Sequence, residues 1–229
     1  MNVLISNDDG IDASGIAVME EIASEIGDPV VFAPFQQQSG VGHQVTIDRS
    51  IQIDQVGENR FAVHGTPADC VRIAVSEFDF DFKMMLSGIN SGGNLGVDVL
   101  MSGTAAAARE ASYFGIESYA VSQYRSKQFV SNWDISKALA RRGIEFVKGK
   151  SGSVQGFWNI NLPCVAERSQ RGNEVPVRLC KLDRNPHKIS YQKQENRFQY
   201  AGVYQDRIRD PSSDVDLCFG GAVTVTRCQ

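Results

Sequence analysis

Val3-Leu4-Ile5-Ser6-Asn7-Asp8-Asp9-Gly10 opens the chain and carries the prediction of its fold. The short apolar run at its start predicts a buried strand. Apolar residues then recur at helical spacing from Ile16 to Ile26, and Gly27 is a natural helix stop. A second apolar strand is expected over 29–33. This β-α-β order favours a parallel, doubly wound sheet and hence an α/β protein.

Two adjacent carboxylates, Asp8 and Asp9, follow the first expected strand directly. In an open α/β sheet, ligands bind outside the carboxyl ends of the strands. Neighbouring carboxylates repel each other when both are ionised, so such a pair usually needs a cation in order to stay charged. Taken alone, Asp8-Asp9-Gly10 is more typical of a turn that caps a helix. The hypothesis of a cation site therefore depends on what else reaches the same edge.

The rest of the chain predicts further elements of one domain. Strands are expected over 45–47, 51–53, 61–63, 83–87, 117–122, 156–162 and 222–226, the first three as an antiparallel excursion, and helices are expected from Thr66, from Ser102 and over 133–147. Beyond residue 170, short alternating runs indicate an antiparallel β arm. We predict a single domain over 1–229, with a core over about 1–168, an arm over about 169–212 and a returning terminal strand over about 213–229.

The composition is that of an ordinary globular protein. The chain has 229 residues, of which 42% are hydrophobic and 22% charged. A net charge of −4 gives no reason to expect a nucleic-acid polymer or a membrane surface as partner, and no apolar run approaches the length of a membrane span. The chain shows no signal-peptide pattern, and its five scattered cysteines have no CxxC spacing. We therefore expect reduced thiols and a cytoplasmic protein.

Three loops that follow expected parallel strands bring oxygen ligands to one edge of the sheet. They contribute Asp8 and Asp9, then Ser39 from a glycine-rich loop, then Asn90 from Ser87-Gly88-Ile89-Asn90. Two carboxylates, a hydroxyl and an amide suit a hard divalent ion such as Mg²⁺ or Mn²⁺, and the lack of histidine or thiolate argues against zinc or copper. The sequence predicts one divalent metal ion held by these four residues, with room left for water and a phosphate.

An anion site is expected beside this ligand set. Ser102-Gly103-Thr104 opens an alanine-rich helix after a glycine- and asparagine-rich loop. A helix start presents free backbone N–H groups and a partial positive charge, which together bind anions. Ser102 alone could serve only as the helix cap. A divalent cation that faces a helix N-terminus is a suitable cradle for a phosphate monoester.

Two further residues lie near the predicted site in the sequence. His43 follows Ser39 closely enough to enter the site, although a lone histidine is more often structural. Asp98 lies between the asparagine-rich loop and the helix, and it is expected to organise the ligands from outside. Arg109 and Glu110 are assigned to the surface or an interface of the helix.

The order of these motifs carries a resemblance to a known family. The motifs are Asn7-Asp8-Asp9-Gly10, Gln38-Ser39-Gly40, Gly65-Thr66-Pro67-Ala68-Asp69-Cys70, Ser87-Gly88-Ile89-Asn90 and Ser102-Gly103-Thr104-Ala105-Ala106. In this the chain resembles the SurE family, stationary-phase survival proteins that act as nucleoside monophosphate phosphatases. The resemblance is strongest over about the first 125 residues, and the combined motifs are far more specific than any one of them.

The resemblance implies a Rossmann-like three-layer α/β/α fold, a mostly parallel sheet and a C-terminal β arm that exchanges between subunits of a homodimer or homotetramer. It implies 5′- and 3′-nucleotidase activity, hydrolysis of short polyphosphate in some members, and dependence on Mn²⁺ or Mg²⁺. The family's metal ligands correspond to Asp8, Asp9, Ser39 and Asn90. Its phosphate site corresponds to Asn94, Ser102, Gly103 and Thr104.

The favoured mechanism is attack of a metal-bound water on a phosphate monoester, with Asp8 and Asp9 as the catalytic residues. A nucleophilic aspartate remains an alternative, although the chain lacks an Asp-x-Asp pattern there. A phospho-receiver domain also has paired acids after its first strand. It needs a further acceptor aspartate, whereas the strand ending at Ser87 leads to Asn90. A nucleotide-binding module without catalysis is the third alternative.

Overall fold

The computed structural model describes the chain except for residues 127–131, 149, 151–155 and 165–174. Nine strands form one sheet in the order β3-β4-β2-β1-β5-β6-β7-β11-β8. Its centre consists of β1 (Asn2–Ser6), β2 (Asp28–Pro34), β5 (Phe82–Asn90), β6 (Glu117–Gln123) and β7 (Phe157–Leu162), each parallel to its neighbour. The prediction of an α/β protein with a mostly parallel sheet is confirmed.

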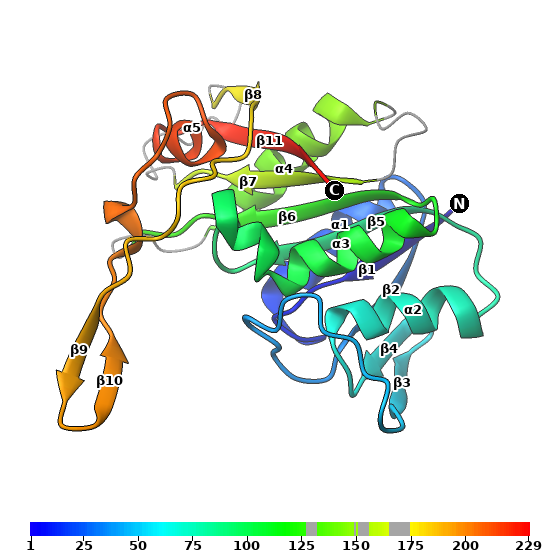
Figure 1. Cartoon of the computed structure of the whole chain (residues 1–229). Helices are drawn as coiled ribbons and strands as arrows, with labels where there is room; N and C mark the ends of the chain where they lie inside the picture. Colours follow the sequence, from blue (N-terminus) through cyan, green and yellow to red (C-terminus); the bar gives the residue numbers. More distant parts are fainter. Residues whose placement is uncertain (127–131, 149, 151–155, 165–174) are drawn as a thin grey trace.

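Helices cover both faces of this sheet, which gives three layers (Figure 1). One face packs against α1 (Ser14–Ser24) and α4 (Trp133–Val147), the other against α2 (Pro67–Glu77) and α3 (Gly103–Tyr113). Strand β1 shows why both faces need a cover. Its Val3 and Ile5 belong to the core on the α1 and α4 side, and Leu4 belongs to the core on the α2 and α3 side. Successive side chains of a strand point to opposite faces, so an uninterrupted apolar run requires a cover on each side.

The predicted antiparallel excursion is smaller than expected. Strand β3 (Ile53–Gly57) pairs antiparallel with β4 (Arg60–Val63), but β4 itself pairs parallel with β2. The strand expected over 45–47 is wrong, because these residues lie in no strand. Thr46 instead donates its backbone N–H (2.9 Å) and its hydroxyl (2.7 Å) to the carboxylate of Asp69 on α2. A tertiary contact therefore overrides the local alternation.

In the C-terminal part, two strands join the main sheet and two form a separate hairpin. Strand β11 (Val223–Cys228) pairs antiparallel with β7, a direction that the sequence did not predict, and β8 (Val177–Leu179) pairs parallel with β11 at the sheet edge. A short helix that was not predicted, α5 (Asp214–Phe219), precedes β11. Strands β9 (Tyr191–Gln194) and β10 (Arg197–Tyr200) form a separate antiparallel hairpin. It projects away from the sheet at the lower left of Figure 1.

Short 3-10 helices also occur among the described residues. The first, η1 (Gly96–Leu100), precedes α3, and the second, η3 (Tyr204–Asp206), follows β10. Within the part of the chain that the structure describes, no helix is both long and apolar enough to cross a membrane.

Candidate active site

The loops after β1, β2 and β5 meet at the carboxyl edge of the sheet. Strand β1 lies between β2 and β5, so successive connections leave it in opposite directions, and such a switch point is where open α/β sheets bind ligands. Asn7 closes the first loop by accepting from the N–H of Gly10 (3.2 Å) and donating to its carbonyl (2.8 Å). The backbone carbonyl of Asp8 accepts from the N–H of Gln38 (2.7 Å), which ties the first loop to the second.

Asp8 is the buried member of the acidic pair, with 5% of its surface exposed. The hydroxyl of Thr104, in the first turn of α3, donates to its Oδ1 at 2.5 Å. Burial raises the pKa of the Asp8 carboxyl, the Thr104 hydrogen bond opposes that rise, and the negative charge of Asp9 adds to it. A nearby positive charge would therefore stabilise the ionised form of the Asp8 carboxylate.

Asp9 joins the loops on both sides of β1. Its Oδ2 accepts from the backbone N–H of Ser91 at 2.8 Å, and its Oδ1 lies 3.5 Å from Gln37 Nε2. The same Gln37 nitrogen donates to Ser39 Oγ at 2.8 Å. Because one donor reaches both Asp9 and Ser39, these two predicted ligands face one small area of the edge.

Asn90 ends β5 with its amide oriented by a local bond. Its Nδ2 donates to the carbonyl of Gly92 at 2.7 Å, and among the described residues no hydrogen bond uses its Oδ1. The oxygens of Asp8, Asp9, Ser39 and Asn90 form a donor set without nitrogen or sulfur. The described residues contain no cluster of three or more His, Cys, Asp or Glu that could hold a metal ion. The chemistry of these donors fits Mg²⁺ or Mn²⁺.

The start of α3 lies against Asp8. Ser102 caps the helix by accepting from the N–H of Ala105 at 3.0 Å. A Cβ placed on Gly103 would come within 2.8 Å of the Asp8 Cβ and 3.1 Å of its Oδ2, so only glycine permits this approach. The start of α3 therefore adjoins Asp8, and both the hydroxyl and the backbone N–H of Thr104 bond its carboxylate.

Asn94 has a structural environment that the sequence did not indicate. It is buried, its Nδ2 donates to Ser122 Oγ (2.8 Å) and its N–H to Asn161 Oδ1 (2.8 Å). Its carbonyl accepts from the side-chain amides of Asn159 (2.9 Å) and Asn161 (3.0 Å). These contacts fix the loop after β5 to strands β6 and β7. The only sequence signal was the alternation of asparagines at 159 and 161, and a phosphate-binding role for Asn94 stays a prediction.

His43 and Asp98 contact other groups than the predicted ligands. His43 Nε2 lies 2.7 Å from Glu110 Oε2 and its Nδ1 3.5 Å from Arg109, both on α3. Glu110 also accepts from Arg72 Nε at 2.7 Å, and the His43 and Arg72 bonds lower the pKa of its carboxyl against the effect of burial. Arg109 and Glu110, expected at the surface or an interface of the helix, are buried within the chain.

Asp98 holds the base of the hairpin segment. Its carboxylate accepts from His187 Nε2 (2.5 Å), the Tyr204 hydroxyl (2.6 Å) and Arg207 Nη1 (2.9 Å). These partners precede and follow β9 and β10, so Asp98 ties both ends of the hairpin to η1. The roles of His43 and Asp98 as organisers of the metal ligands stay predictions.

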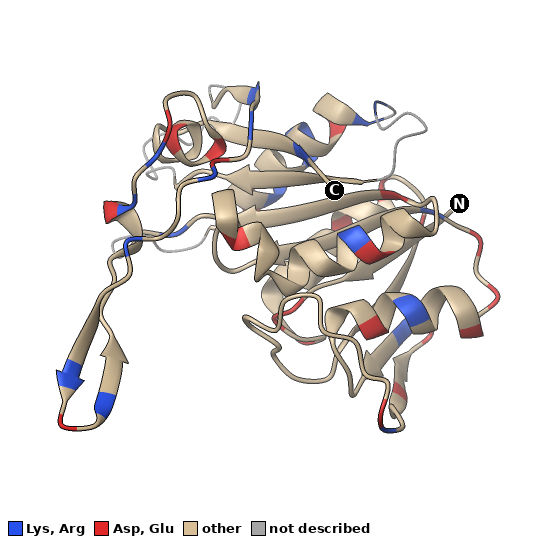
Figure 2. Ribbon diagram, in the orientation of Figure 1, with Lys and Arg blue, Asp and Glu red and all other residues tan. Residues whose placement is uncertain are grey.

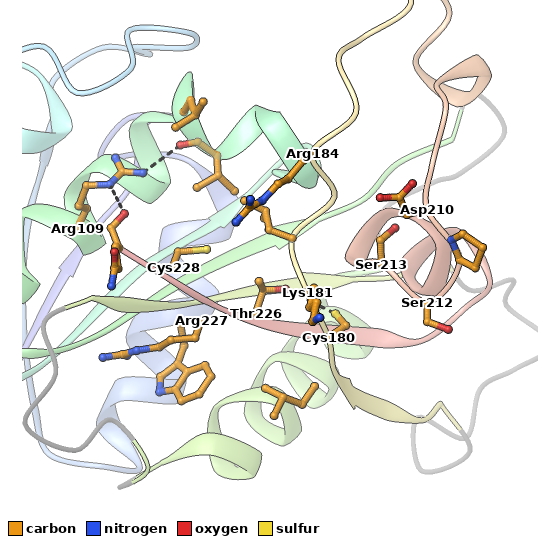
Figure 3. A pocket seen from close by; sticks show the side chains of 17 residues that line it. Arg109, Cys180, Lys181, Arg184, Asp210, Ser212, Ser213, Thr226, Arg227 and Cys228 are labelled. Carbon is orange, nitrogen blue, oxygen red and sulfur yellow. Dashed lines mark hydrogen bonds between the residues drawn. The ribbon is translucent and has the colours of Figure 1, made fainter.

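A cavity of about 1410 Å³ lies elsewhere, along β8 and β11. Figure 3 shows Arg109, Arg184 and Arg227 around it together with Cys180 and Cys228. None of the predicted ligands lines it. The predicted ligands thus lie at the edge around Asp8 and Asp9, outside this cavity, and we take that edge as the candidate active site.

These features define a class: a doubly wound α/β protein with an acidic, oxygen-rich site at its switch point, set against a helix N-terminus. The chain belongs to the SurE family, since the family described as "Survival protein SurE" matches residues 3–188.

Relatives and a solved structure agree with this assignment. A Synechocystis protein, whose name gives it provisionally as a 5′-nucleotidase, is 40% identical over 228 residues, which cover 99% of both chains. The 5′-nucleotidase SurE of Neisseria gonorrhoeae is 37% identical, covering 100% of this chain and 92% of that protein. The crystal structure of the SurE protein from Aquifex aeolicus superposes with a TM-score of 0.86 at 24% identity, covering 100% of this chain and 93% of that one.

Proposed function

We propose that this protein is a 5′-nucleotidase that hydrolyses nucleoside monophosphates with the help of one Mn²⁺ or Mg²⁺ ion held by Asp8, Asp9, Ser39 and Asn90. The names of the SurE relatives from Neisseria gonorrhoeae and Rhodopirellula baltica support the substrate class. The observation that carries the proposal is the contact of Asp8 with Gly103 and Thr104. It joins an acidic pair, which favours a cation, to a helix start, which favours an anion.

The residues of the chain divide the work as follows. When bound, the ion would make a water molecule more acidic and neutralise phosphate oxygens. Thr104 holds Asp8 in place, and Ser91 and Gln37 hold Asp9 and Ser39. The N–H of Gly103, at the start of α3, would bind a phosphate oxygen, whose negative charge the helix dipole favours, while the N–H of Thr104 bonds Asp8. Oriented ligands of this kind reduce the reorganisation that the reaction requires.

Phosphate release from a panel of 5′- and 3′-nucleotides and short polyphosphate tests the proposal. The panel is measured with Mn²⁺, with Mg²⁺ and with a chelator. We expect release from nucleoside monophosphates that needs the metal. Full activity in chelator would refute the metal site, whereas binding of nucleotide without release would indicate the non-catalytic module. Incorporation of labelled oxygen from water into phosphate in one turnover, without a trapped acyl phosphate, would favour direct attack by water over a nucleophilic aspartate.

We further propose that the β9–β10 hairpin joins subunits into a homodimer or homotetramer. All eight of its strand residues are exposed, including Tyr191, Phe198 and Tyr200. Both strands carry a basic residue, and an acidic one stands at the turn (Figure 2). An isolated two-stranded hairpin is marginally stable in water, so a partner surface would complete it.

A further inference from the structure

A cationic side chain reaches the loop that orients Asp9. Arg125 follows β6, and its Nη1 donates to the hydroxyl of Ser91. The backbone N–H of the same serine donates to Asp9 Oδ2 at 2.8 Å. One residue thus separates the guanidinium from a carboxylate of the proposed metal site.

The charge of Arg125 meets no acidic side chain within the described part of the chain. Other arginines have carboxylate partners, as Arg72 does with Glu110 and Arg207 with Asp98. Among the described residues, no Asp or Glu forms an ion pair with Arg125, and its side chain is exposed. A guanidinium has five N–H donors in a fixed fork, so several remain available for an anion beside the bond to Ser91.

The strand order places this cation across the edge from Ser39. In the order β2-β1-β5-β6, Ser39 follows the first strand and Arg125 the last, with Asp8, Asp9 and Asn90 between them. A phosphate held over the acidic pair would therefore lie on the same edge as Arg125, close to its partner Ser91. Arginine suits this position because its planar fork matches phosphate oxygens.

We propose that Arg125 is a substrate-binding residue whose guanidinium binds the phosphate of the nucleotide. The assignment rests on the proposed phosphatase function. It adds a positive charge to a site whose other proposed ligands are neutral or negative. The competing explanation is structural: Arg125 would only hold Ser91, and through it Asp9, in position.

Steady-state kinetics and inhibition by inorganic phosphate test the assignment in wild type, R125A, R125K, S91A and R178A. We expect R125A to raise KM and the inhibition constant for phosphate by roughly tenfold to a hundredfold, because a hydrogen bond to a charged group is lost. Its kcat should change less than its KM, and R125K should recover part of the loss. R178A is the matched control, since Arg178 is exposed on β8 and donates to the carbonyl of Val177.

S91A separates the two explanations. It removes the hydroxyl that Arg125 contacts but keeps the backbone N–H that orients Asp9. If Arg125 binds substrate, S91A should change the phosphate inhibition constant far less than R125A does. An equal effect of S91A and R125A would overturn the assignment, as would an R125A enzyme whose inhibition constant stays within about twofold of wild type.

These experiments distinguish failure of the proposed phosphatase function from failure of the Arg125 assignment. If wild type releases phosphate and R125A is unchanged, only the Arg125 assignment fails. If wild type hydrolyses no nucleotide, calorimetric titration with inorganic phosphate in the presence of Mn²⁺ decides the matter. Phosphate binding that R125A abolishes would support the assignment, and binding that R125A leaves intact, or no binding by wild type, would overturn it.

Discussion

The carboxyl edge of the sheet and the β9–β10 hairpin are built in opposite ways. At the edge, polar side chains are held by bonds between distant loops, such as Thr104 to Asp8 and Ser91 to Asp9. In the hairpin every strand residue is exposed, including the cross-strand pair Tyr191 and Tyr200, whose ring centroids lie 5.6 Å apart.

This difference indicates a division of roles. Side chains that are already oriented require little reorganisation when a ligand binds, as catalysis demands. Exposed aromatic side chains gain free energy only when a partner covers them. Substitutions at the edge should therefore change chemistry and leave assembly intact, whereas substitutions in the hairpin should do the reverse.

The largest effect is expected at Asp8. D8N should lower phosphate release about a thousandfold, because the neutral amide that replaces the buried carboxylate no longer attracts the metal ion. The association state should stay that of wild type in sedimentation velocity. D12N is the control, since Asp12 is exposed in the same loop. Wild-type activity in D8N would show that the acidic pair at the sheet edge is not needed for phosphate release.

A smaller loss is expected at Thr104, whose hydroxyl orients Asp8. T104V keeps the buried shape but removes the donor, so phosphate release should fall roughly tenfold to a hundredfold, with a raised metal requirement. T104S retains a hydroxyl and should stay much nearer to wild type. Titration of activity with Mn²⁺ measures both variants. Equal behaviour of T104V and T104S would show that the hydrogen bond to Asp8 is not needed.

Substitutions in the β9–β10 hairpin should change self-association and leave phosphate release unchanged. F198S removes an exposed aromatic side chain and should weaken self-association by about tenfold, because such residues dominate interface energetics. Phosphate release per subunit should not change. Q199S alters a polar neighbour on the same strand and serves as the control. Sedimentation equilibrium measures the dissociation constants. A monomeric wild type, or loss of activity in F198S, would contradict the separation of roles.

The smallest effect, a change in stability alone, is expected at Glu110 on α3, which contacts His43 and Arg72 and none of the proposed metal ligands. E110Q removes the charge that pairs with His43 and Arg72 and should lower the free energy of unfolding by about 1 kcal/mol at pH 7, without changing KM. The pKa of Glu110 is lowered from its ordinary value of 4.5. Its stabilisation is therefore complete above pH 4.5 and is lost as the pH falls through the folded-state pKa.

Denaturant unfolding at several pH values checks the Glu110 prediction. The difference between wild type and E110Q should shrink in acid, whereas E77Q, at an exposed position of α2, should show no such pattern. A raised KM in E110Q would instead bring His43 into the active site.

Local signals predicted much of the fold. Thr66-Pro67 indicated the start of α2, and the structure has the full capping box, with Thr66 accepting from the N–H of Asp69 and Asp69 accepting from that of Thr66. Both partners lie within one turn, so four residues of sequence suffice. The strand expected over 45–47 failed for the opposite reason, since Thr46 is held by Asp69, 23 positions away.

The hub at Asp98 could not be predicted in the same way. Its partner Tyr204 is separated from it by 106 positions and Arg207 by 109. No periodicity relates residues so far apart, and their approach depends on how the hairpin segment leaves β8 and returns to α5. Asp98 was expected to organise the metal ligands from outside, which stays a prediction, and its bonds to both ends of the hairpin segment were not predicted.

By itself the sequence determined that apolar runs become strands with covered faces, that a helix starts at Ser102 and that two acids follow the first strand. These are short-range consequences of side-chain periodicity and capping. Only the tertiary structure decided that Thr104 donates to Asp8 across 96 positions and that Ser91 donates to Asp9 across 82. A hydrogen bond requires its atoms to be placed within a few tenths of an ångström, and only the packed sheet and helices supply that placement.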